Sequence, residues 1–400
     1  MPGWDEDIDH RPTVASVSGR RVVDVMVEAG VRTILFDDPI PLDLAFVADV
    51  PVDLDLDDWP AAESVLRRLH LQQPIDAVIG VYDLSLPLAA YLAARLGVRG
   101  LSLAAVMNCN DKLRMRLTLR AAAINVPAHV VVSESGEAQA AARRLGYPVL
   151  VKKVTGAAGA GTLLCRDQRQ VKDAVTALHD DTDPRLLVEE YVDGPEYAIQ
   201  TVTRDSVTEL ISVFSQRTAT DGRLVELGYD FPPGLDESQE SELRRLVITA
   251  LRALGFDHGI AHTQVRLTPA GPVLINVVAR PPGGRLCEVT EAVSGVDMVQ
   301  AALDVALGIP LSRRAPVAEH VRYRCVTFDQ AGTVSYDPGA LTERAAPAPL
   351  ISMDVNTGDH VSPKGGVYGR IISYDDDPLS LERLTGALGL SVQPHPSEGQ

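Results

Sequence analysis

A lysine pair followed at once by a glycine-rich segment is the strongest chemical signal in the chain. Lys152 and Lys153 end a short apolar run, and Gly156, Gly159 and Gly161 come directly afterwards. Glycine lets the backbone approach an anion closely, so its N–H groups and a lysine ammonium can together hold a phosphate. The segment lacks the Gly-Lys-Ser/Thr ending of a Walker A loop. A plain hairpin loop explains it equally well, and both interpretations stay open from this segment alone.

Carboxylates form a second group of candidate site residues. Glu189 and Glu190 end another apolar run, and Glu196 follows a turn at 193–195. Burying an unpaired carboxylate is strongly unfavourable, so these side chains are expected to line a cleft or to face a lysine. A hairpin with one charged outer face is the structural alternative.

Polar side chains also recur on two neighbouring predicted strands, 262–267 and 272–278. Alternation puts the following positions on one face of each strand: His262, Gln264 and Arg266 on the first, and Asn276, Val278 and Arg280 on the second and just after it. A polar face that leads into Arg-Pro-Pro-Gly-Gly at 280–284 can form a ligand site. A two-stranded edge with one wet face accounts for the same pattern equally well.

Hydrophobic periodicity places these segments in an α/β fold. Strands and helices alternate up to residue 107, with strands predicted at 13–17, 31–36 and 77–81, which indicates a small doubly wound domain. A helix is predicted to open at 108–112, where Lys112 and Arg116 lie four residues apart and point the same way. A surface location for these two like charges is the alternative.

The remaining segments complete the predicted organisation. Other expected elements are a strand at 129–132, a helix at 134–145, one continuous strand at 201–214, a helix at 238–254 and a single helix over 289–307. The predicted domains are an N-terminal α/β domain (1–107), a linker helix with a lid-like subdomain (108–190), a central catalytic subdomain (191–310), a β-rich C-terminal region (311–392) and a disordered tail (393–400).

Composition narrows the possible partners. The chain has 400 residues, of which 46% are hydrophobic and 23% charged, and its net charge of −17 argues against nucleic acid or an anionic membrane as a partner. The four cysteines form no Cys-x-x-Cys pair and are expected to be reduced thiols. The chain contains no apolar run long enough for a membrane span or a signal peptide, so we expect a cytoplasmic protein.

The order of these segments resembles the ATP-grasp superfamily, specifically its carboxylate–amine ligases. The resemblance covers about residues 75–285. It rests on an Asp-Lys-x-x-Met-Arg helix start at 111–116, a lysine strand and phosphate-covering loop at 146–161, an adenine hinge with a ribose carboxylate at 188–196, and metal-ligand strands at 259–284. The implied fold has an N-terminal doubly wound domain, a small lid module, a central antiparallel sheet and C-terminal strands.

The resemblance also implies roles for individual residues. Lys112 and Lys152 would hold the phosphates of ATP, with Gly156, Gly159 and Gly161 closing over them. Glu189, Glu190 and the backbone at Val192 would form the adenine hinge, and Glu196 would hold the ribose. Arg280 would stabilise an acyl-phosphate, while Gly283 and Gly284 would hold the substrate carboxylate. The implied reaction joins a small carboxylic or amino acid to an amine, with ATP and Mg²⁺ as cofactors, in an enzyme that forms a homodimer.

The metal-ligand strands depart from the pattern of the superfamily. His-x-Glu and Glu-x-Asn-x-Arg are usual there, whereas this chain has Gln264, Asn276 and Val278 in place of the two glutamates and the asparagine. Mg²⁺ prefers carboxylate oxygen, and one pair of unit charges ~4 Å apart is worth about 4 kcal/mol at an effective dielectric constant of about 20. Three hypotheses follow: an active ATP-dependent ligase, a non-catalytic nucleotide- or ligand-binding protein, or an enzyme with altered, metal-independent chemistry.

Overall fold

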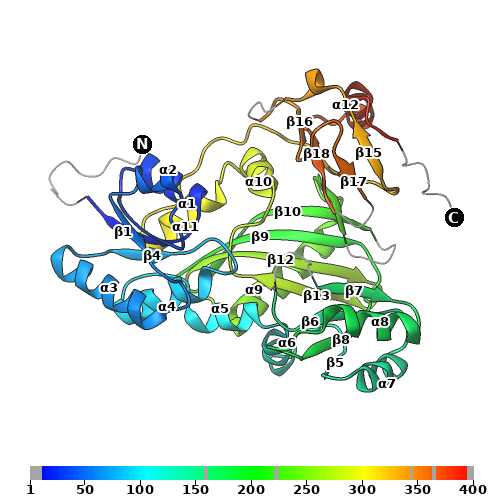
Figure 1. The fold of residues 1–400 in the computed structure, drawn as a ribbon, viewed down its shortest axis with the longest axis horizontal. Coiled ribbons are helices and arrows are strands. Elements are labelled where there is room, and N and C mark those ends of the chain that lie inside the picture. The colour runs from blue at the N-terminus through cyan, green and yellow to red at the C-terminus, as the bar shows by residue number, and fades with distance from the viewer. Residues whose placement is uncertain (1–10, 157–160, 220–224, 343–345, 363–365, 394–400) are drawn as a thin grey trace.

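The computed structural model describes residues 11–156, 161–219, 225–342, 346–362 and 366–393, whose strands form four sheets (Figure 1). Gly159 and positions 394–400 of the predicted tail lie outside the described residues. The α/β fold class is confirmed, and the predicted strands at 13–17 and 129–132 have the predicted bounds. No helix in the described part of the chain is long and apolar enough to cross a membrane.

The N-terminal sheet is parallel and is covered on both faces. Its strand order is β3-β2-β1-β4, with β1 (Thr13–Val17), β2 (Arg32–Asp37), β3 (Val50–Asp53) and β4 (Ala77–Ile79). Helices α3 (Trp59–Gln72) and α4 (Leu86–Leu96) pack on one face, and α1 (Arg20–Glu28) and α11 (Met298–Leu307) on the other. Every residue of β1 is buried, as expected for a central strand between two helix layers. The short α2 (Leu42–Ala45) precedes β3.

A small antiparallel sheet carries the lysine strand. Its order is β5-β8-β6-β7, with β5 (His129–Val132), β6 (Val149–Lys153), β7 (Thr162–Cys165) and β8 (Leu186–Glu190). Helices α7 (Ser135–Leu145) and α8 (Gln168–Leu178) bury their apolar residues against it. The opposite face of this sheet is therefore left for charged side chains such as Lys152.

The central sheet is antiparallel and spans much of the molecule (Figure 1). Its order is β13-β12-β9-β10-β11-β14-β18-β16, with bounds as follows: β9 (Glu196–Arg204), β10 (Val207–Ala219), β11 (Val225–Phe231), β12 (Gly259–Thr268), β13 (Gly271–Val278), β14 (Val321–Val326), β16 (Leu350–Met353) and β18 (Gly369–Ser373). One face packs on α5 (Leu103–Asn110), α6 (Lys112–Ala121) and α9 (Glu237–Leu254), and the other on α10 (Leu286–Ser294) and α11. The sheet thus joins strands from both sides of residue 311, and the proposed domain limits remain a prediction.

The C-terminal residues add a small satellite layer. A three-stranded sheet has the order β17-β15-β19, with β15 (Gly332–Ser335), β17 (His360–Val361) and β19 (Ser391–Gln393). Helix α12 (Ser380–Leu388) and the 3₁₀ turn at Pro338–Ala340 lie beside it and share its apolar cluster.

The helix expected to open at 108–112 begins at Lys112 and is capped by Asp111, as predicted, although a separate helix, α5, precedes it. Two other expectations about the elements were wrong. The helix expected over 289–307 is broken at Gly295, where a Cβ would lie 1.9 Å from the Arg314 carbonyl oxygen. The strand expected at 201–214 turns back after Arg204 through two residues with positive φ.

A substitution at Gly228 would test how the central strands pack against the C-terminal strands. This residue of β11 has φ +145°, and a Cβ there would lie 2.0 Å from the backbone oxygen of Tyr323 on β14. We expect Gly228→Ala to lower the free energy of unfolding by about 1–3 kcal/mol in urea denaturation, because the strained backbone and the sheet must both adjust. Gly386→Ala is the control, since it lies within α12 with open space around it and should be neutral or stabilise by about 0.5–1 kcal/mol. Equal stability of the Gly228→Ala variant and the wild type would contradict this packing.

Candidate functional site

A buried carboxylate lies at the centre of the candidate site. Glu189, on β8, has 0% side-chain exposure and is bound by two basic side chains from different elements. Arg116 of α6 donates from Nε and Nη2 to the two carboxylate oxygens, at 2.6 and 3.2 Å, and Lys152 of β6 forms an ion pair with the same carboxylate. Arg116 also donates to the backbone oxygen of Ile275 on β13 at 2.7 Å. This cluster therefore links α6, the lysine sheet and the central sheet.

Strand register explains why these charges meet. Glu189 pairs with Leu150 across β6 and β8, and Lys152 lies two residues further along β6 on the same face. Burial raises the pKa of Glu189, but Arg116 and Lys152 outweigh this effect and hold it at about 2. Burial lowers the pKa of Lys152, and the carboxylate of Glu189 opposes this change. The cluster thus keeps a carboxylate ionised in the interior because two cations surround it.

Lys112 extends this charge toward the glycine-rich loop. Asp111 caps α6, and the Lys112 backbone N–H donates to the Val154 oxygen at 2.9 Å, which fixes the helix start beside the end of β6. The Lys112 ammonium donates to the Gly156 oxygen at 2.9 Å. Burial and the neighbouring charge of Lys152 lower its pKa to about 8. Lys112 therefore lies next to Gly156, where the sequence predicted a phosphate loop, and Lys152 lies close enough to Lys112 to affect its pKa.

The hinge residues have partners of their own. Glu196 on β9 accepts bonds from Nε and Nη2 of Arg266 at 3.0 and 2.7 Å, and Arg266 Nη1 donates to the Val192 oxygen at 2.6 Å. The Arg266 guanidinium also lies over the Tyr191 ring, 4.9 Å from its centroid. Glu190 faces away from this group and accepts the Ala128 N–H at 2.9 Å. Glu196 and Val192 therefore lie together, whereas Glu190 lies on the side of the linker that enters β5.

The predicted metal strands carry hydrogen-bonded amides. Gln264 and Asn276 are register partners on β12 and β13, and Asn276 Nδ2 donates to Gln264 Oε1 at 3.4 Å. Gln264 Nε2 donates to Gln216 Oε1 at 3.2 Å and to Glu196 Oε1 at 3.5 Å. Within the described residues, no group of three or more His, Cys, Asp or Glu side chains could hold a metal ion. The donor set present here does not fit Mg²⁺, which takes carboxylate oxygens.

Arg280 is positioned by Asp83, which lies between β4 of the N-terminal sheet and α4. Its Nε and Nη2 each donate to one oxygen of Asp83 at 2.8 Å, and Nη1 donates to the Pro281 oxygen at 2.8 Å. Burial, together with the positive charge of Arg280, lowers the pKa of His262 to about 3, so this imidazole is neutral. Gly283 and Gly284 follow Arg280, and Gly284 has φ +61° with the Tyr323 hydroxyl 3.4 Å from where a Cβ would be. Arg280 and the two glycines therefore lie between the N-terminal domain and the central sheet.

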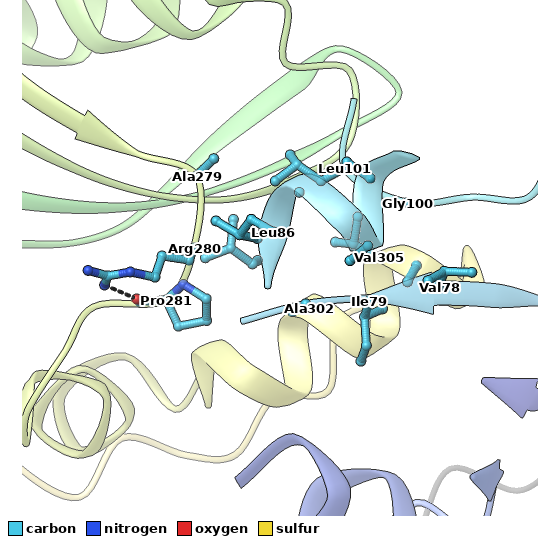
Figure 2. A pocket seen from close by; sticks show the side chains of 16 residues that line it. Val78, Ile79, Leu86, Gly100, Leu101, Ala279, Arg280, Pro281, Ala302 and Val305 are labelled. Carbon is cyan, nitrogen blue, oxygen red and sulfur yellow. Dashed lines mark hydrogen bonds between the residues drawn. The ribbon is translucent and has the colours of Figure 1, made fainter. Parts of the chain in front are cut away.

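An apolar cavity of about 40 Å³ lies behind the loop that carries Arg280 (Figure 2). Its lining includes Leu86 of α4, Val305 of α11, and Leu101, which precedes α5. Among the described residues that line it, Arg280 is the one charged residue. Figure 2 shows the guanidinium directed away from these apolar side chains. The cavity is a packing gap between domains, and the lysine cluster lies elsewhere.

Two carboxylates of the site, Asp83 and Glu226, were not identified by the sequence analysis. Asp83 follows β4, and the carboxyl end of a parallel strand is a common place for site residues, so its position offered a usable signal. Glu226 on β11 accepts the Tyr229 hydroxyl at 2.8 Å. Desolvation by the surrounding protein raises the pKa of the Glu226 carboxyl, and the nearby negative charge of Glu196 raises it further. Nothing in the local sequence distinguishes Glu226 from a surface glutamate.

Comparison with known proteins adds independent information. Residues 111–314, just over half of the chain, match the family model of the carbamoyl-phosphate synthase L chain, ATP binding domain. An uncharacterized protein, y4rH, of Sinorhizobium fredii is 26% identical over 72% of this chain and 62% of its own length. Carnosine synthase 1 of Gallus gallus is 29% identical over 68% of this chain and 32% of its own length. The chain therefore spans less than two thirds of both relatives.

A solved structure covers the whole fold. The L-amino acid ligase from Bacillus licheniformis has a TM-score of 0.78 and 22% identity, and the match covers 97% of this chain and 100% of that one. The likeness establishes that the N-terminal sheet, the lysine sheet and the central sheet follow one known arrangement.

The buried cluster leads to a stability prediction. We expect Glu189→Gln to lower the free energy of unfolding by about 3–5 kcal/mol, because Arg116 and Lys152 would be left buried without a counter-charge. In the wild type this contribution is present above the ordinary pKa of 4.5 and is lost as pH falls through about 2, whereas the variant lacks that pH dependence. Urea denaturation across pH provides the measurement.

The matched control for this prediction is Glu209→Gln. Glu209 pairs with Arg313 on the surface, where the two side chains are 49% and 46% exposed. The control should cost less than about 1 kcal/mol, since exposed ion pairs are weak. Equal effects of the two substitutions would contradict the role assigned to Glu189.

Proposed function

Because this chain belongs to the ATP-grasp superfamily, through the family of the carbamoyl-phosphate synthase L chain ATP-binding domain, we propose that it is an ATP-dependent carboxylate–amine ligase. One observation carries the proposal. Lys112 contacts Gly156 and lies near Lys152, which is held by the buried carboxylate of Glu189. Two partly or fully buried lysines that lie close together repel each other, and a polyphosphate bound between them would relieve that repulsion.

The substrates we propose are a small carboxylic or amino acid and an amine. The likeness to the L-amino acid ligase from Bacillus licheniformis supports this class. Free cysteines that are buried or half-buried, Cys109, Cys165, Cys287 and Cys325, support a reducing compartment such as the cytoplasm.

The proposed nucleotide site uses groups from three elements. Lys112 and Lys152 would hold the phosphates, while Glu196 and the Val192 backbone would lie at the ribose and adenine. Arg116 acts indirectly, because it holds Glu189 and so fixes the position of Lys152. ATP, when bound, supplies the phosphoryl group that converts a carboxylate into a form that an amine can attack.

The proposed acid and amine sites lie between the two large domains. Asp83 orients the planar guanidinium of Arg280, which then presents fixed N–H donors to the oxygens of the reacting acid. Glu226, whose pKa is raised, is suited to accept the proton that the amine loses when the C–N bond forms. Exclusion of water from this junction would protect an activated acid from hydrolysis.

A second candidate function is a nucleotide-binding protein without turnover. The hydrogen-bonded Gln264 and Asn276 favour it, because they occupy the strand positions where catalytic metal ligands were expected. Both functions require the lysine cluster, and they differ in whether bound ATP is consumed.

The first test is the dependence of ADP release on both substrates. For a ligase, ADP and phosphate should accumulate when an acid and an amine are both present and stay at background when either is omitted. Arg280→Lys should lower kcat by about 100-fold with little change in KM for ATP, because the ammonium keeps the charge but loses the fork of donors. A coupled assay of ADP gives both constants across a screen of amino acids and amines.

The control variant is Arg313→Lys, which makes the same change at an exposed ion pair on the surface. It should leave kcat unchanged. ATP binding without any substrate-dependent ADP release across the screen would favour the binding protein over the ligase.

The depressed pKa of Lys112 predicts how nucleotide affinity depends on pH. Its free-state pKa of about 8 means that the ammonium loses its proton as pH rises through that value. We expect the Kd for ATP to be constant below about pH 7 and to rise about tenfold above about pH 9, since a charge-assisted contact is lost. Isothermal titration calorimetry in buffers of one ionic strength measures this profile.

Lys112→Arg is the comparison variant for the pH profile. A guanidinium stays charged over this range, so the variant should bind with a flat profile. A wild-type profile that is also flat would show that Lys112 does not contact the phosphates.

A further inference from the structure

Neutral amides from β13, β12 and β10 line one polar face of the central sheet, where β9, which carries Glu196, lies between β12 and β10. Asn276 of β13 donates to Gln264 of β12, and Gln264 donates to Gln216 of β10. Gln216 in turn donates from Nε2 to the Thr218 hydroxyl at 3.4 Å. These side chains form a continuous amide ladder, defined here as Gln216, Gln264 and Asn276.

The charge beside the ladder is already balanced. Glu196 accepts one bond from Gln264 and is paired with Arg266 through two guanidinium nitrogens. The side chains of Arg266 and Glu196 are only 7% and 8% exposed, so water screens them little. A divalent cation at the ladder would meet the positive guanidinium of Arg266. Glu226 also lies near Glu196, but it is exposed to solvent and accepts the Tyr229 hydroxyl. The electrostatics therefore oppose a metal ion at this position.

Counting donors shows what the ladder still offers. A primary amide has two N–H donors, and Gln264 uses both, toward Gln216 and Glu196. Asn276 uses one, toward Gln264, and its side chain is half-buried rather than sealed. One N–H of Asn276 therefore remains for a ligand. That N–H suits an anionic oxygen, and the neutral carbonyl oxygen of the same amide supplies no charge to hold a cation.

We propose that the cleft binds its nucleotide free of a divalent cation, with the Asn276 amide donating to a phosphate oxygen. This inference rests on the proposed nucleotide function and specifies the form of the nucleotide that binds. Lys112 and Lys152 then neutralise the phosphates in place of a metal ion. A nucleotide already complexed with Mg²⁺ loses affinity, because its metal must sit near Arg266.

Calorimetric titration of the wild-type chain with ATP tests the inference directly. We expect the Kd in EDTA to be several-fold lower than the Kd in excess MgCl₂. Binding that requires Mg²⁺ would overturn this inference and leave the nucleotide function intact. Absence of ATP binding under both conditions would overturn the inference and the proposed function together.

A set of variants tests the role of the ladder itself. Gln264→Glu, Asn276→Glu and Val278→Asn combined in one chain should reverse the preference, so that ATP binds at least about tenfold more tightly with Mg²⁺ than in EDTA. Gln168→Glu makes the same amide-to-carboxylate change on the exposed surface of α8 and should keep the wild-type preference. A triple variant that binds ATP with the wild-type preference would overturn the role assigned to the ladder. The wild-type titration remains decisive if the triple variant does not fold.

Discussion

The ion pairs of one buried carboxylate determine how the parts of this molecule meet. Glu189 has no contact with solvent, so its charge is tolerable only while Arg116 and Lys152 both bind it. Arg116 comes from a helix that packs on the central sheet, and Lys152 comes from the small lysine sheet. The need to compensate one charge therefore fixes α6 against β6 and β8, and this arrangement also places Lys112 beside Gly156.

The same principle extends through the candidate site, where each charged group described above has a protein partner in the absence of ligand. Lys112 binds a backbone oxygen, Glu196 binds Arg266, and Arg280 binds Asp83. A ligand must then exchange partners with these groups rather than fill unpaired charges. Such exchange favours a ligand that replaces each hydrogen bond or ion pair it breaks, because a buried charge left without a partner costs several kcal/mol. Specificity for an anion of fixed shape follows from this requirement.

Local pattern predicted much of the fold but could not predict the long-range pairs. Strands 13–17 and 129–132 have clear apolar runs bounded by turn residues, and their limits were right. The break at Gly295 could not be seen, since it depends on the backbone of Arg314 packing against it from a distant loop. In the site, the expectation that Glu189 lines a cleft or faces a lysine agrees with its ion pair to Lys152, whereas the resemblance had assigned Glu189 to the adenine hinge. The partner of Arg280 lies 197 residues earlier in the chain, so only the assembled topology brings Asp83 to it.

The amide ladder shows that the shape and the charge of a site can be set separately. Glutamine and asparagine match the carboxylates of glutamate and aspartate in shape, so Gln264 and Asn276 can pack between β12 and β13 without disturbing the sheet. The two kinds of side chain differ in charge. An amide N–H donates to an anion, whereas a carboxylate carries a negative charge that attracts a cation. Because Arg266 and Glu196 already balance each other, a carboxylate introduced at the half-buried Gln264 would add an uncompensated charge unless a cation bound beside it. Metal binding and stability are therefore coupled at this position, and the neutral ladder is the solution that needs no bound ion.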